Sequence, residues 1–365
     1  MIPLIVIILS LIAVVYLYTL LPKFGRKPSG KRLEVIQKSP NYKKGKFQNI
    51  SHTPSLTEGA SYAGVISQFF FKRNPTRVPK KEIPSIKTDL LHLPKEEDVL
   101  IWFGHSSYFI QLNGKRLLVD PVFSGDASPL PGMNKSFIGS DIYTVTDFPE
   151  IDYLLITHDH YDHLDYKTIR DLRPKIKNVI CGLGVGAHLE RWGYSHTAII
   201  EKDWDETLEL ERNFVMHTTS ARHFSGRAFA RNNTLWLSFV IQTPTLKLFI
   251  GGDSGYDTHF TTIGNKYGPF DLAILENGQY DLNWKYIHAL PDEVLRAAME
   301  LKAKKVLPVH SGKFALANHA WDEPLKKITA LNKNIKIPLI TPMIGEIVYL
   351  KNDQQQFKQW WEGAF

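Results

Sequence analysis

One short segment of the chain concentrates side chains that can hold metal ions. His158, His160, Asp162 and His163 lie within six residues, directly after the apolar run Leu154 to Thr157. Imidazole and carboxylate groups together suit borderline cations such as zinc, whereas a closed structural zinc site usually uses cysteine thiolates. We therefore expect these four residues to be ligands of a catalytic site at which metal ions activate water.

Such a loop needs a rigid support, and the chain from Val99 onward shows a pattern that supplies one. The strand-like runs are Val99 to Phe103, Ser107 to Leu112, Arg116 to Val119, Tyr153 to Thr157, Asn178 to Cys181, Phe214 to Thr218, Leu235 to Gln242, Leu246 to Ile250, Leu272 to Leu275 and Val306 to Val309. Helical patterns lie between several of them, at Tyr166 to Leu172, Gly186 to Trp192, Pro291 to Lys302 and Glu323 to Leu331. This alternation predicts an α/β domain in which helices cover apolar sheets.

The N-terminal segment from Ile2 to Leu21 has no charged residue. Its length is about that of a helix that crosses a bilayer, roughly 20 residues, so residues 1–22 are expected to form a transmembrane anchor. A cleaved signal peptide would need basic residues before the apolar run and small residues at a cleavage site, and neither is present. Positive charges follow the run instead, which predicts a single-pass anchor with a cytoplasmic catalytic domain. The lone Cys181 excludes an intrachain disulfide and agrees with that compartment.

Charge is distributed unevenly along the chain. Residues 1–81 contain 14 Lys and Arg against two acids, whereas the rest contains 30 against 35. Residues 23–80 are therefore expected to be a basic linker or an arm along the surface, and an anionic membrane leaflet would attract it. Within it, residues 61–72 predict a short amphipathic helix that packs on the body or on a membrane. Nucleic-acid binding is not expected because the site region is not basic, and residues 81–365 are assigned to the hydrolase domain.

The H-x-H-x-D-H pattern from His158 to His163 resembles the motif of the metallo-β-lactamase superfamily, whose members share a four-layer αβ/βα sandwich. The resemblance implies three further ligands. His223 looks like the third histidine of the first metal site, beside His158 and His160. Asp253 looks like the aspartate that bridges the two metals, and His310 looks like the last ligand of the second site, beside Asp162 and His163. Two Zn²⁺ ions are the expected cofactors, with iron or manganese as the alternatives.

A finer resemblance, over about residues 99 to 330, is to the N-acyl phosphatidylethanolamine-hydrolysing phospholipase D family. It rests on the segments Gly104 to Ser107, Asp120 to Ser124, Ala127 to Pro129, Tyr161 to Tyr166, Gly252 to Tyr256, Gly268 to Ala273 and Phe314 to Asn318. The stretch Glu276 to Tyr280 and the charge-free N-terminus depart from the family pattern. The resemblance implies a membrane-anchored phosphodiesterase of the phospholipase D type, with N-acyl phosphatidylethanolamine or a related phospholipid as its substrate.

Other residues have weaker assignments. Asp162 and His288 are the catalytic candidates, because Asp162 can accept a hydrogen bond from the attacking hydroxide and His288 can hydrogen-bond a phosphoryl oxygen or the leaving group. His105 and Asp120 either orient the ligands from behind or serve the structure alone. The remaining histidines are expected to be structural or exposed: His52, His92, His188, His196, His217, His259 and His319.

Two rival functions stay open at this point. A lactonase or a soluble phosphodiesterase of the same superfamily would use the same chemistry on a different substrate. A membrane-anchored binding protein that has lost activity belongs to another class, and the intact ligand set argues against it. The sequence carries no indication of the oligomeric state.

Overall fold

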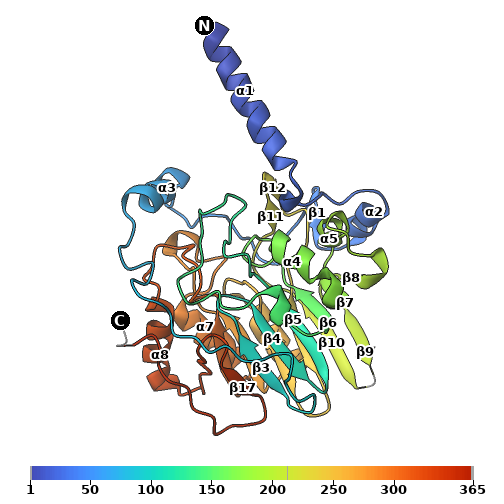
Figure 1. Ribbon diagram of the computed structural model, residues 1–365, viewed down its shortest axis with the longest axis vertical. Coiled ribbons are helices and arrows are strands. Elements are labelled where there is room, and N and C mark those ends of the chain that lie inside the picture. The colour runs from blue at the N-terminus through green and yellow to red at the C-terminus, as the bar shows by residue number, and fades with distance from the viewer. Residues whose placement is uncertain (1, 212, 363–365) are drawn as a thin grey trace.

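Two β-sheets packed face to face form the centre of the computed structural model, which describes residues 2–211 and 213–362 (Figure 1). The first sheet has the order β17 (Ile347–Tyr349), β3 (Val99–Trp102), β4 (Tyr108–Leu112), β5 (Lys115–Val119), β6 (Ile151–Ile156), β7 (Ile176–Gly182) and β8 (Ile199–Lys202). The second has the order β16 (Val306–Val309), β15 (Leu272–Glu276), β14 (Lys247–Ile250), β13 (Ser238–Gln242), β10 (Phe214–Thr219) and β9 (Thr207–Glu211).

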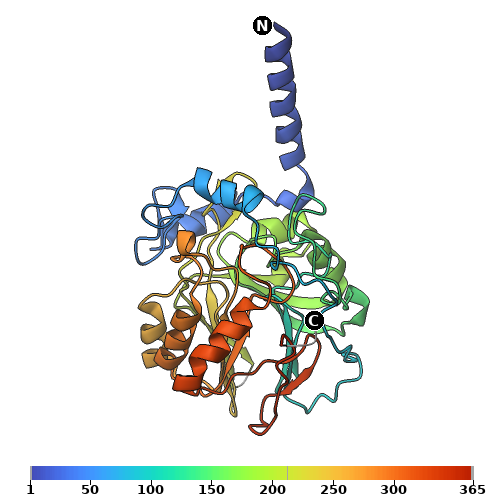
Figure 2. The same ribbon diagram turned by 90° about the vertical axis from the view of Figure 1, so that its left-hand side faces the viewer.

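Helices cover the outer face of each sheet. The first sheet carries α4 (Tyr166–Leu172) and α5 (Gly186–Arg191), whose Ile169 and Leu189 are buried against it. The second carries α6 (His259–Tyr267), α7 (Pro291–Glu300) and α8 (Glu323–Ile335), which pack on it through residues such as Leu295 and Ile328 (Figure 2). A third apolar core lies between the two sheets. The predicted α/β class and four-layer sandwich are therefore confirmed.

The strand directions bring one set of strand ends together. β14, β15 and β16 are parallel neighbours, and β10 runs in the same direction because β13 is antiparallel to both β10 and β14. In the first sheet β5, β6 and β7 are also parallel. Loops that follow β6, β10, β14 and β16 can therefore meet at one edge of the sandwich, and each of them carries a predicted metal ligand.

The N-terminal helix α1 (Ile2–Thr19) projects away from the sandwich, and its side chains from Pro3 to Leu17 are exposed (Figure 1). No helix in the described part of the chain combines the length and the apolar character that a membrane crossing needs. The transmembrane helix expected over Ile2 to Leu21 is therefore not confirmed by this structure.

The segment after α1 is bonded closely to the sandwich around α5. Arg191 donates hydrogen bonds to the carbonyl oxygens of Leu20 and Gly25, at 2.6 and 2.7 Å, and Trp192 Nε1 donates to the carbonyl oxygen of Pro22 at 2.8 Å. A helix that the sequence did not predict, α2 (Gly30–Lys38), adds a bidentate ion pair from its Arg32 to Glu190 and a third contact to Glu201.

Farther along this segment, Ile36 and Phe47 are buried within the core between the sheets. Part of the predicted basic arm thus packs against the sandwich and contributes to its core. The helix expected over residues 61–72 forms as α3 (Tyr62–Phe71). The domain boundary at residue 81 stays a prediction.

Candidate metal centre

The seven residues expected to hold metal ions lie together at the sandwich edge where their strands end. His158, His160, Asp162 and His163 follow β6, and one residue each follows β10, β14 and β16: His223, Asp253 and His310. Their potential ligand atoms form overlapping groups in which all atoms lie within 4.8 Å of one another. The structure therefore brings together side chains that are up to 152 positions apart in the sequence, from His158 to His310.

Three imidazole rings converge on one point. His158 Nε2 lies 2.9 Å from His160 Nδ1, which lies 3.2 Å from His223 Nε2. The far nitrogens of the outer rings carry the protons, since His223 Nδ1 donates to the carbonyl oxygen of Ile287 and His158 Nδ1 donates to the Thr157 hydroxyl. The inner nitrogens of His158 and His223 therefore present lone pairs, which is the form that binds a cation.

Burial favours the neutral form of these rings. It lowers the pKa of His160 to about 4 and lowers the pKa of His158 and His223 well below the ordinary value for histidine. Neutral imidazole is the metal-binding form, because a protonated ring nitrogen has no free lone pair. The three rings thus fit a cation.

A second set of acceptors meets beside the first. His163 Nε2 lies 3.2 Å from Asp253 Oδ2 and 3.5 Å from Asp162 Oδ2, while His163 Nδ1 is bonded to Asp120 Oδ2 at 2.8 Å. His163 Nε2 and Asp253 Oδ1 are buried and have no hydrogen-bond partner. Burial lowers the pKa of His163, but the carboxylates of Asp253 and Asp162 outweigh burial and raise this pKa well above the ordinary value. Buried acceptors so close together need a positive charge between them, and a metal ion can take the place of the proton on Nε2, so this donor set also fits a metal ion.

His310 completes the second set from the end of β16. Its Nδ1 lies 3.2 Å from Asp253 Oδ1 and 2.9 Å from the Ser106 hydroxyl. The backbone of His310 is left-handed, with φ of 66°, and His105 beside it has φ of 53°. Left-handed backbone at a residue other than glycine is uncommon and concentrates at functional sites.

Gly252 lets the loop that carries Asp253 approach the histidine loop closely. Its φ is 61°, and a Cβ atom at this position would lie 2.9 Å from Cβ of Thr157. Glycine adopts this conformation without steric cost. A larger residue would push the Asp253 loop away from His158.

His105 and Asp120, for which the sequence left an orienting and a purely structural role open, both contact proposed ligands. Asp120 Oδ2 accepts hydrogen bonds from His163 Nδ1 and from the Thr157 hydroxyl, which in turn orients His158. His105 Nε2 lies 2.8 Å from Asp162 Oδ2. These contacts fix ring orientation and tautomer, which is how outer groups tune a metal site.

His288 lies at the same site, and its partner is a residue that the sequence had marked only as a departure from the family. Its Nδ1 lies 2.7 Å from Glu276 Oε2 and 4.0 Å from Asp253 Oδ2. Burial raises the pKa of Glu276 well above its ordinary range and lowers the pKa of His288. With a protonated Glu276 as the donor to Nδ1, the Nε2–H of His288 would be free to donate to a substrate.

A cavity of about 310 Å³ opens beside the ligands. Its lining includes His160, Asp162, Asp253, His288 and His310 together with an outer group of Ser55, Tyr62, Phe224, Arg231, Gln279, Trp284, Ile287 and Leu316. Sequence reasoning missed Arg231 and Tyr62 as pocket residues, and the only available signal for Arg231 was its position eight residues after His223. None of the seven histidines assigned to structural roles occurs in a potential metal-binding group of the described residues.

Comparison with protein families agrees with this geometry. Residues 115–311 match the family model described as Beta-lactamase superfamily domain. An uncharacterized protein of Mycobacterium tuberculosis is 33% identical over 331 residues, which cover 90% of this chain and 88% of the relative. An enzyme of Caenorhabditis elegans named N-acyl-phosphatidylethanolamine-hydrolyzing phospholipase D 1 is 29% identical, over 67% of this chain and 74% of that protein.

Solved structures share the fold. A metallo hydrolase of the archaeon Ignicoccus hospitalis superposes with a TM-score of 0.52, over 69% of this chain and 97% of that chain. Its sequence identity is 19%, so the likeness concerns the sandwich alone.

Proposed function

Because the chain belongs to the metallo-β-lactamase superfamily and is a metallo-hydrolase that resembles the N-acyl phosphatidylethanolamine-hydrolysing phospholipases D, we propose that it is a phosphodiesterase of the phospholipase D type. Its substrate is N-acyl phosphatidylethanolamine or a related phospholipid. The observation that carries this proposal is the complete ligand set beside a cavity that also contains His288 and Asp162.

Two Zn²⁺ ions are the proposed cofactors. His158, His160 and His223 would hold one, Asp162, His163 and His310 would hold the other, and Asp253 would bridge them. When bound, such a pair supplies a nucleophilic water at neutral pH and stabilises negative charge on phosphoryl oxygens. The nitrogen-rich first set fits zinc well, and iron or manganese is the alternative.

The chain's own residues position the reactants. Asp162, oriented by His105, accepts a hydrogen bond from the attacking water and holds it for attack on phosphorus. His288 donates a hydrogen bond from Nε2 to a phosphoryl oxygen or to the leaving oxygen, while Glu276 fixes its ring. Water adds to phosphorus and the bond to the ethanolamine oxygen breaks, so that phosphatidic acid and N-acylethanolamine leave.

The surface around the cavity supports a substrate that lies in a membrane. α1 and α3 occupy the same end of the molecule as the β11 (Gly226–Arg227) and β12 (Ala230–Arg231) hairpin, and Tyr62 of α3 and Arg231 of β12 line the cavity (Figure 1). Phe71 at the end of α3 and Phe229 at the hairpin tip are each 84% exposed. We propose that α1 anchors the enzyme, that these apolar groups touch the bilayer, and that the catalytic domain is cytoplasmic.

Purified protein loaded with zinc tests the proposal when it is incubated separately with labelled N-acyl phosphatidylethanolamine and with lactones. Release of phosphatidic acid and N-acylethanolamine is expected, and Asp162→Asn should abolish it. Lactone opening without headgroup release would instead support the lactonase alternative. Protein that binds the phospholipid but turns over neither substrate would support the binding protein.

A further inference from the structure

One residue of the cavity does not belong to the ligand set or to its supports. Arg231 is the one lysine or arginine among the described residues that line the cavity. It lies on β12, whose strand partner β11 begins three residues after His223. The hairpin thus presents a permanent positive charge in the same cavity as Asp162 and His288.

The contacts of Arg231 leave its charge without a carboxylate. Its guanidinium carbon lies 4.0 Å from the centre of the Phe224 ring, and Tyr62 of α3 lines the same cavity. No ion pair within the described residues includes Arg231. By contrast, the partly buried Arg32 and Arg222 each face an acidic side chain.

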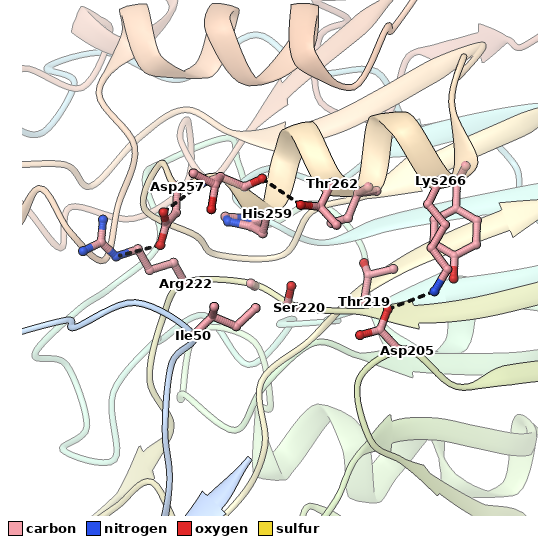
Figure 3. A pocket seen from close by; sticks show the side chains of 13 residues that line it. Ile50, Asp205, Thr219, Ser220, Arg222, Asp257, His259, Thr262 and Lys266 are labelled. Atoms are coloured by element: carbon pink, nitrogen blue, oxygen red, sulfur yellow. Dashed lines mark hydrogen bonds and ion pairs between the residues drawn. The ribbon is translucent and has the colours of Figure 1, made fainter. Parts of the chain in front are cut away.

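A neighbouring cavity shows the alternative arrangement (Figure 3). Its volume is about 120 Å³, and its positive residues are paired within it: Lys266 with Asp205 at 3.2 Å and Arg222 with Asp257 at 3.7 Å. The charges of that cavity are therefore satisfied by the protein. In the larger cavity, Arg231 has no acidic partner among the described residues.

An unpaired and half-buried guanidinium is costly for the fold, because arginine cannot lose its proton in proteins. Burial lowers the pKa of Arg231, in agreement with this cost. The planar group keeps several N–H donors, and phosphate oxygens match its fork geometry. The aromatic face of Phe224 holds the guanidinium plane in place.

We propose that Arg231 binds an anionic oxygen of the substrate's phosphodiester and so restricts the cavity to anionic esters. The proposal rests on the proposed function, since it names the residue that separates phosphodiesters from neutral lactones and carboxyl esters.

Binding of dimethyl phosphate, measured by calorimetry on the zinc-loaded full chain, tests Arg231 apart from turnover. Arg231→Gln should weaken this binding roughly 10- to 100-fold, the range expected for a lost charge-assisted hydrogen bond. Arg231→Lys should recover only part of it, because an ammonium cannot bind two oxygens in a fork. The matched control is Arg170→Gln, which changes an exposed arginine of α4 paired with Asp171.

Kinetics with two model substrates complete the test. For bis(p-nitrophenyl) phosphate, Arg231→Gln should raise KM by a similar factor with a smaller change in kcat, and for p-nitrophenyl acetate it should change neither. Unaltered binding of dimethyl phosphate, or equal losses on both substrates, would overturn the proposal. If the wild-type protein opens lactones and spares phospholipids but binds dimethyl phosphate through Arg231, the proposed function and the restriction to anionic esters both fail, and only the binding of an anionic oxygen by Arg231 stands.

Discussion

Replacing Asp120 with asparagine removes one charge behind the proposed ligands and keeps the size of the side chain. The carboxylate accepts hydrogen bonds from His163 Nδ1, from the Thr157 hydroxyl and, through Oδ1, from the Thr157 amide at 2.9 Å. The asparagine carbonyl oxygen can still accept the bond from the Thr157 amide. Its NH₂ group, however, is a donor at the position where Oδ2 of Asp120 accepts the bonds from His163 Nδ1 and the Thr157 hydroxyl. The proton of His163 must then move to Nε2, the atom that faces Asp253.

The backbone should tolerate Asp120→Asn, because φ at this position is 40° and asparagine adopts the left-handed region readily. Loss of a group that orients a ligating histidine typically reduces metal affinity by about 10- to 100-fold, which equals about 1.4–2.7 kcal/mol. Metal content after titration with dipicolinate measures the effect, and half of the zinc should leave the variant at a 10- to 100-fold lower chelator concentration.

Asp271→Asn is the matched control, since Asp271 also accepts a backbone hydrogen bond, from Lys247 at 2.7 Å, but lies outside the metal centre. It should release zinc at the same chelator concentration as the wild type. If Asp120→Asn did so too, the orienting role of Asp120 and the assignment of His163 as a ligand would both be refuted.

Three further predictions concern stability and membrane contact. Removal of the metals should lower the unfolding free energy of the wild type, by about 4 kcal/mol where the free metal concentration had been 1,000 times its Kd. In thermal unfolding with and without chelator, a His223→Ala, Asp253→Ala variant should lose much less stability. An equal loss in the two proteins would argue against a metal site. The Arg32 guanidinium lowers the pKa of Glu190 from 4.5 to about 2. Glu190 therefore stabilises the fold above about pH 4.5, and this contribution disappears as the pH falls towards 2. Urea unfolding should find Glu190→Gln less stable than the wild type at pH 7 and equally stable near pH 2, whereas a difference that is constant with pH would contradict the ion pair. Phe229→Ser should leave the unfolding free energy within about 0.5 kcal/mol, since the ring is exposed, yet should reduce flotation with phosphatidylserine vesicles; unchanged flotation would contradict bilayer contact at the hairpin.

Sequence patterns predicted the sheets well where strands are apolar on both faces. β6 contains the apolar run Tyr153 to Ile156 and β15 the run Leu272 to Leu275, because helices and the opposite sheet bury these strands from both sides. The strand expected from Leu235 begins only at Ser238, because Leu235 and Leu237 donate their backbone hydrogen bonds to Leu183 and Thr157 of the other half of the molecule. No local pattern indicates that change of partner.

Helix α2 was not predicted for a similar reason, because contacts with distant parts of the chain fix it. Within it only Ile36 is buried, and the ion pairs that fix it join Arg32 to residues 158 and 169 positions away. The proposed ligands could be named from the sequence because their residue types carry the chemistry, and the structure brings their side chains together. Arg231 and Glu276 could not, since only the folded chain places them beside the metal centre.

The hydrogen bonds that join α5 to the segment following α1, from Leu20 to Gly25, indicate where a shortened protein should begin. Arg227 donates to the carbonyl oxygens of Asp159, within the histidine loop, and of Leu164, directly after it, and also to that of Lys23. His188 connects the Arg26 amide to Asp159. A chain cut at residue 40 would keep every proposed ligand yet leave this loop without part of its outer support. We therefore expect the minimal catalytic unit to start near Leu20, about 60 residues before the boundary that the charge pattern suggests.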